Sequence, residues 1–151
     1  MIYIGVDPGS KTGAYAAITT SDKGDMVEVF PWDNNAFIEW VIEKKASGAG
    51  CSAVVERVWS MPKEAASSAF AFGSNAGFIE GALRALKVRV EMVLPKTWKK
   101  EFGLNGNKAN SIEVCHRLFP DVSLKRTEKC RKDDSNFAEA LLMAEYAKRH
   151  F

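Results

Sequence analysis

Three acidic residues, Asp7, Glu56 and Glu139, stand in segments that a folded chain could bring together. Asp7 follows a short β-branched run, Glu56 interrupts an apolar strand-like segment, and Glu139 falls early in a C-terminal segment with helical periodicity. A carboxylate inside an apolar strand is costly unless it is paired or bound to a metal. Hard oxygen ligands select Mg²⁺ or Mn²⁺, and two such ions about 3.5–4 Å apart activate water for phosphodiester hydrolysis.

Each acid also has a plainer interpretation when it is taken alone. Arg57, next to Glu56, could form an ordinary ion pair with it. An acid before Pro-Gly, as at Asp7, often caps a turn. The metal hypothesis therefore depends on the three acids together and on the absence of zinc-type ligands near them.

The basic residues are concentrated in one part of the chain. Residues 87–132 hold twelve Lys or Arg and five Asp or Glu, a local charge of +7, whereas the whole protein carries only +2. A basic stretch in an otherwise acidic chain suits a polyanionic partner, although a solvated lysine-rich surface would look the same.

Length and composition exclude several classes of protein. The chain has 151 residues, 46% of them hydrophobic and 26% charged, which predicts one globular domain over residues 1–151. No apolar run approaches the roughly 20 residues of a membrane helix, and the N-terminus lacks a signal-peptide pattern, so we expect a cytoplasmic protein with no membrane partner.

The three cysteines, Cys51, Cys115 and Cys130, are odd in number and scattered along the chain, which predicts free thiols. Cys115 and His116 are adjacent and cannot form a zinc knuckle. We also expect no small-molecule cofactor.

The elements that must position the acids follow from hydrophobic periodicity and turn signals. Strands are predicted at 2–6, 13–20, 26–30, 52–58 and 88–94, the first three as an antiparallel meander and 52–58 as a central parallel strand. Helices are predicted at 34–46, 62–87, 96–102, 108–119 and from Asp134 or Ser135 to Arg149. Asn34 or Asn35 would cap the first helix, and Pro62 would start the second. The small residues of helix 62–87 suit either an interface between two copies or packing within one chain.

Several segments resemble, in order and spacing, the RuvC-type Holliday junction resolvases of the RNase H-like superfamily. The resemblance covers nearly the whole chain. Its motifs are IGVDPGS at 4–10, VVERV at 54–58, LPKTWKK at 94–100, GLNGNKA at 103–109 and AEALL at 138–142. The compact length and the Pro-x-x-Trp-Lys segment look most like the phage or prophage branch.

The resemblance implies an α/β, RNase H-like fold with a five-stranded mixed sheet flanked by helices on both faces. It implies a homodimer that acts as a crossover junction endodeoxyribonuclease, cutting four-way or branched DNA by paired hydrolysis. Asp7, Glu56 and Glu139 would hold two Mg²⁺ or Mn²⁺ ions per active site. The DNA-binding lysines would be Lys96, Lys99, Lys100 and Lys108. Lys100 would in addition stabilise charge in the transition state.

Two further positions follow from the same resemblance. Members of the family usually carry Asp or His three residues before the final acid, where this chain has Asn136. The fourth metal ligand is therefore either Asp134 or Asn136 through its amide oxygen. Trp59 matches an aromatic residue near the junction centre, where it would stack on a base, the alternative being that it packs beneath the long helix.

Two other functions stay open on the sequence. The incomplete fourth ligand is compatible with a junction-binding protein that cuts weakly or not at all. A different RNase H-like nuclease, acting on flaps or on RNA–DNA hybrid, would carry the same acids.

Overall fold

The computed structural model describes residues 1–9, 11–57 and 65–151, and its centre is a five-stranded mixed sheet in the order β3–β2–β1–β4–β5. The antiparallel part is the meander β1–β2–β3, and β4 and β5 continue the sheet parallel to β1. The strands are β1 (Ile2–Asp7), β2 (Ala14–Thr19), β3 (Met26–Pro31), β4 (Cys51–Glu56) and β5 (Arg89–Val93). The predicted mixed sheet, its meander and the parallel position of the fourth strand are confirmed.

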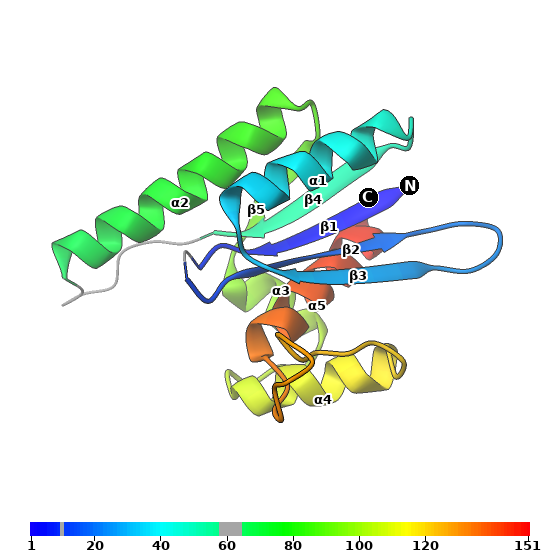
Figure 1. Cartoon of the computed structure of the whole chain (residues 1–151). Helices are drawn as coiled ribbons and strands as arrows, with labels where there is room; N and C mark the ends of the chain where they lie inside the picture. Colours follow the sequence, from blue (N-terminus) through cyan, green and yellow to red (C-terminus); the bar gives the residue numbers. More distant parts are fainter. Residues whose placement is uncertain (10, 58–64) are drawn as a thin grey trace.

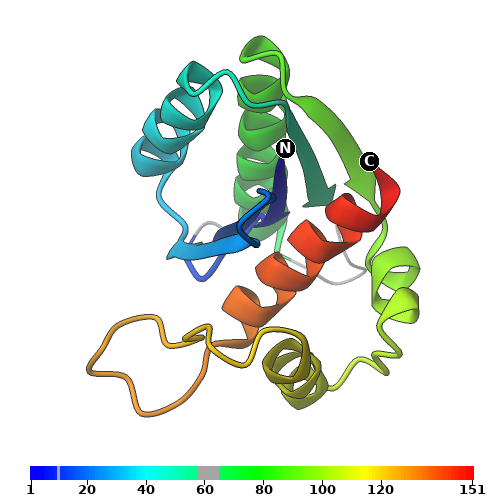
Figure 2. The ribbon, with the colours of Figure 1, turned by 90° about the vertical axis from the view of Figure 1, so that its right-hand side faces the viewer.

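Helices cover both faces of the sheet (Figures 1 and 2). α1 and α2 pack on one face, and α5 crosses the other with α3 and α4 beside it. The helices are α1 (Asn34–Ala46), α2 (Ala66–Ala85), α3 (Pro95–Glu101), α4 (Lys108–Leu118) and α5 (Ser135–His150). This is the predicted α/β, RNase H-like arrangement.

Alternation along the strands divides the core between the two faces. Ile4 and Val6 of β1 pack with the aromatic residues of α1, and Val55 of β4 joins them. Val54, one residue earlier, packs on the opposite face with α5. Because side chains in a strand alternate between the faces, Asp7 and Glu56 belong to the face that α5 covers.

The structure corrects three local predictions. The N-cap of α1 is Asp33, not Asn34 or Asn35, and its Oδ1 accepts a hydrogen bond of 2.8 Å from the Ala36 amide. α2 begins at Ala66 after an extended Ala65, later than the expected start at Pro62, which itself lies outside the described residues. β4 ends at Glu56, so this acid is the last residue of its strand rather than an interior one.

The three cysteines are free thiols, as predicted, and Cys51 and Cys115 are buried. Burial raises the pKa of Cys115 to about 12. No helix in the described part of the chain is both long and apolar enough to span a membrane.

Candidate active site

Asp7 and Glu56 end neighbouring parallel strands. Val6 of β1 is paired with Val55 of β4, so the register brings Asp7 and Glu56 side by side at the same edge of the sheet. Both acids are partly buried. The carboxyl ends of parallel strands are where open α/β sheets commonly place their ligands.

α5 brings the third acid to this edge by packing directly on β1. A side-chain methyl group on Gly5 would overlap the backbone carbonyl of Ala140 and the backbone amide of Ala144, so only glycine permits this approach. Glu139 immediately precedes the closest point of contact and is only 8% exposed. The structure thus brings all three predicted acids to one end and one face of the sheet.

Glu56 is held by a buried tryptophan that sequence reasoning did not assign. The indole Nε1–H of Trp98, in α3, donates a hydrogen bond of 2.9 Å to Glu56 Oε2. Burial raises the pKa of the Glu56 carboxyl above its usual value, the Trp98 hydrogen bond and the charge of Lys99 lower it, and the charge of Glu139 raises it. The influence of Glu139 reflects the closeness of the two carboxylates.

Glu139 has two polar partners on the helices beside α5. Its Oε1 accepts a hydrogen bond of 3.2 Å from Ser111 Oγ in α4 and lies 3.2 Å from Lys99 Nζ in α3. A nearly buried carboxylate needs such partners, because an isolated charge is costly away from water. α3 therefore contacts both glutamates, through two consecutive residues.

The loop that follows Asp7 is fixed from two sides. From α2, the buried Asn75 donates a hydrogen bond of 2.7 Å to the Pro8 carbonyl. From the other face, Arg126 and Asn136 donate to the Thr12 carbonyl at 2.7 and 2.6 Å. The sequence carries no local signal for these contacts, because the partners are far apart along the chain.

Asp134 and Asn136, the two alternatives for a fourth ligand, have different surroundings. Asp134 is the N-cap of α5. Its Oδ1 accepts a hydrogen bond from the backbone N–H of Asn136, and its Oδ2 accepts one of 2.6 Å from Arg126 Nε. Asn136 uses its Nδ2 for the Thr12 carbonyl, which leaves Oδ1 as its acceptor atom. Asp134 is thus engaged at both carboxylate oxygens by the chain itself.

The predicted DNA-binding lysines do not share one environment. Lys96 and Lys100 are exposed on α3, whereas Lys99 is partly buried, with its side chain 24% exposed beside Glu139. Lys108 is the first residue of α4. Trp59, the candidate stacking residue, lies outside the described residues.

The connection from α4 to α5 adds four exposed basic residues: Lys125, Lys129, Arg131 and Lys132. Figure 2 shows this connection returning to the start of α5.

The donor set fits a hard divalent cation in its chemistry. The acids supply carboxylate oxygens at one edge of the sheet, the donor type that hard divalent cations prefer, and Lys99 Nζ holds the cationic position beside Glu139 in this structure. In the described residues, no three Asp, Glu, His or Cys side chains converge on a single point. Asp7, Glu56 and Glu139 are therefore neighbours rather than a closed coordination shell.

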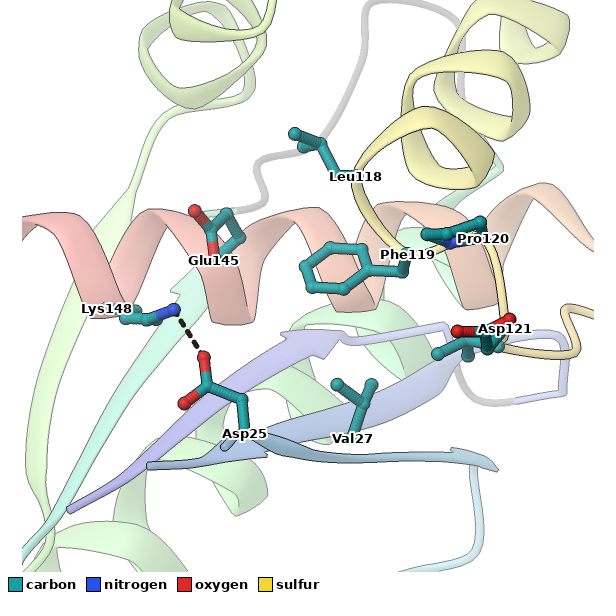
Figure 3. A pocket seen from close by; sticks show the side chains of 9 residues that line it. Asp25, Val27, Leu118, Phe119, Pro120, Asp121, Glu145 and Lys148 are labelled. Atoms are coloured by element: carbon teal, nitrogen blue, oxygen red, sulfur yellow. Dashed lines mark hydrogen bonds and ion pairs between the residues drawn. The ribbon is translucent and has the colours of Figure 1, made fainter. Parts of the chain in front are cut away.

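A surface pocket lies away from these acids (Figure 3). It is lined by residues of β3, the end of α4 and the end of α5, including Val27 and Phe119. An ion pair of 2.5 Å joins two of its lining residues, Lys148 and Asp25. Asp25 precedes Met26, whose strand partner is Thr19, and Thr19 pairs with Ile2 at the start of β1. The pocket thus lies at the opposite end of the sheet from Asp7.

Comparison with known proteins supports the fold. No protein-family model and no curated protein matches the sequence. Among solved structures, Thermus thermophilus RuvC in complex with a Holliday junction substrate is similar, with a TM-score of 0.66 and 16% identity over 99% of this chain and 97% of that chain. The fowlpox virus Holliday junction resolvase has a TM-score of 0.59 and 18% identity, covering 100% of both chains. The yeast mitochondrial Holliday junction resolvase has a TM-score of 0.57 and 12% identity over 97% of this chain and 77% of that chain. The RuvC-like resolvase fold predicted from the sequence motifs is confirmed.

Proposed function

We propose that this protein is a divalent-metal-dependent endonuclease that resolves four-way or branched DNA by paired hydrolysis of phosphodiester bonds. The observation that carries the proposal is the meeting of Asp7, Glu56 and Glu139 at one end and one face of the sheet. The fold shared with resolvases of known structure supports the same substrate class. The enzyme would act in the cytoplasm of a bacterium or of a phage-infected host.

Asp7, Glu56 and Glu139 would hold Mg²⁺ or Mn²⁺, two ions per site. When bound, the ions supply an activated water and neutralise charge on the departing oxygen. We assign the fourth position to Asn136 Oδ1, because both carboxylate oxygens of Asp134 are engaged in the helix cap and in the pair with Arg126. The contacts of Asn136 and Arg126 with Thr12 would keep the loop after Asp7 in place.

The lysines would have different roles in binding DNA. Exposed Lys96 and Lys100, with Lys108 at the start of α4, would contact phosphates along the path to the acids. Lys100 would also stabilise charge that develops at the scissile phosphate. Lys99 would lie closest to the reacting group, because it already contacts Glu139.

The four-way substrate calls for two active sites, which we propose to be supplied by a homodimer. α2 exposes aromatic side chains at its surface: Phe70 is 80% exposed and Phe78 is 39% exposed. A shallow groove between them includes Ser74 and Asn75. Exposed aromatic residues beside small residues suit a self-complementary helix–helix contact.

A single cleavage experiment tests the proposal against its alternatives. The protein is incubated with Mg²⁺ or Mn²⁺ and with labelled four-way, flap, RNA–DNA hybrid and linear duplexes of matched length. We expect symmetric nicks in the four-way substrate and none in the linear duplex. Binding to the junction without cutting would instead indicate a junction-binding protein. The observation that favours this alternative is Asn136 at the position where the family usually has an acid or His. Preferential cutting of flap or hybrid would indicate another RNase H-like nuclease.

A further inference from the structure

Trp98 is a fully buried side chain whose single polar atom points to an acid of the candidate site. Its indole Nε1–H donates to Glu56 Oε2 at 2.9 Å, although Trp98 and Glu56 are 42 residues apart. The ring is fixed by its surroundings, because it packs edge-on against Phe102, with ring centroids 6.5 Å apart, and belongs to the cluster formed by β4, β5, α3 and α5. The donor therefore has little freedom to follow a carboxylate that moves.

This hydrogen bond has a consequence for metal binding. A carboxylate has two oxygens, and because the Trp98 hydrogen bond is made to Oε2 of Glu56, Oε1 is the oxygen that we place toward a cation. The donor is neutral, which means that it orients the carboxylate without cancelling the negative charge that attracts a cation. Residues that orient metal-binding groups from outside the coordination shell commonly change metal affinity when they are replaced.

The other tryptophans in the described residues show that this arrangement is specific to Trp98. Trp32 donates to Asn34 at the start of α1, on the other side of the sheet. Trp40 is also buried in that layer, and its Nε1 has no hydrogen-bond partner among the described residues. Replacing Trp40 by Phe thus removes a buried indole without removing a contact to an acid.

We infer that Trp98 is a positioning residue that orients the Glu56 carboxylate for a divalent cation, without itself contacting metal or DNA. The inference rests on the proposed function, since Glu56 must be a metal ligand. It explains why a tryptophan, rather than another large apolar residue, fills this position in α3.

The test measures Mn²⁺ binding in the absence of DNA, by the electron paramagnetic resonance signal of free Mn²⁺. Three proteins are compared: the parent, Trp98→Phe and the matched control Trp40→Phe. We expect Trp98→Phe to bind Mn²⁺ roughly ten- to a hundredfold more weakly and Trp40→Phe to bind it like the parent. If Trp98→Phe does not fold, benzothienylalanine at position 98, in which sulfur replaces the N–H group, removes the donor while keeping the shape of the ring.

A spectroscopic measurement separates orientation from packing. The chain has four tryptophans, so the indole N–H region of a ¹⁵N–¹H spectrum should be simple, and the Trp98 signal is identified by its loss in Trp98→Phe. We expect this signal to shift with Glu56→Gln and on addition of Mg²⁺, while the Trp40 signal stays in place.

Three outcomes are informative. Weakened Mn²⁺ binding only in the Trp98 variant supports the inference. A parent that binds Mn²⁺ and cuts junctions, together with a Trp98 variant of unchanged Mn²⁺ affinity, overturns the role of Trp98 alone. A parent that neither binds Mn²⁺ nor cuts overturns the proposed function and this inference with it.

Discussion

Gly5 of β1 lies directly against the backbone of Ala140 in α5, and no side chain fits between them. This contact sets how far α5 stands from the sheet at the point where it delivers Glu139 to the edge that holds Asp7 and Glu56. The packing of the core and the arrangement of the acids thus depend on the same glycine.

Replacing Gly5 by Ala should therefore harm both stability and activity. The added methyl group meets backbone atoms, which cannot rotate away, so α5 must shift. We expect the free energy of unfolding to fall by about 1–3 kcal/mol, as for other overpacked cores, and cleavage to fall with it. Urea unfolding measures the change.

Gly81→Ala is the matched control for this prediction. Gly81 lies in α2 with open space where its Cβ would be, so alanine should raise stability by roughly 0.5–1 kcal/mol. Equal stability of Gly5→Ala and the parent would show that the close approach of α5 does not constrain the fold.

The sequence predicts the elements well because these depend on local patterns, and it singles out the three acids because they follow or interrupt segments with such patterns. Strand alternation, turn residues and helical periodicity locate the strands within about two residues. The predicted N-cap of α1, Asn34 or Asn35, is wrong because residues 33–35 read Asp-Asn-Asn and all three side chains have capping chemistry. The structure selects Asp33.

The contacts that hold the acids could not be predicted in this way, because they join distant segments. Trp98 reaches Glu56 only because α3 follows β5, the neighbour of β4 in the sheet. Arg126 donates a hydrogen bond to the Thr12 carbonyl although the two residues are 114 positions apart in the sequence. Neither pair leaves a periodic or spacing signal in the sequence.

Lys100→Ala should reduce the salt dependence of junction binding. Each phosphate contact releases counterions, so the loss of one should flatten the slope of log affinity against log salt by about 0.9. Junction affinity is measured in EDTA across a salt series. Lys44→Ala is the control, because Lys44 lies in α1 and is paired with Glu28 at 2.6 Å. An unchanged slope for Lys100→Ala would mark this residue as solvated surface.

Asn136→Asp should raise the cleavage rate several-fold at low Mg²⁺, because the negative charge that it adds where we place the fourth ligand outweighs the loss of the Nδ2 hydrogen bond to the Thr12 carbonyl. Asp134→Asn retains a side chain that can cap α5 but loses the charged pair with Arg126, so it should cut near the parent rate. Rates are compared across a Mg²⁺ titration. Loss of cleavage in Asp134→Asn, with no effect of Asn136→Asp, would instead identify Asp134 as the ligand.

Phe70→Asp should convert a dimer into folded monomers, since this side chain is 80% exposed in the single chain and lies on the face that we propose for the dimer contact. Sedimentation measures the mass, and the junction assay should show single nicks in place of paired ones. Met26→Asp, at a position 52% exposed in the edge strand β3, is the control and should stay dimeric. A parent that is monomeric at assay concentrations would contradict the proposed dimer.

The most direct test of the central claim is the cleavage of a four-way junction by Glu56→Gln in Mg²⁺. Glutamine keeps the shape of the side chain and an oxygen that can accept the Trp98 hydrogen bond, but it removes a charge from the site proposed to bind cations. We predict that cleavage is abolished while junction binding is retained or becomes tighter, because one less carboxylate repels the phosphate. Cleavage at the parent rate would contradict the metal-nuclease account.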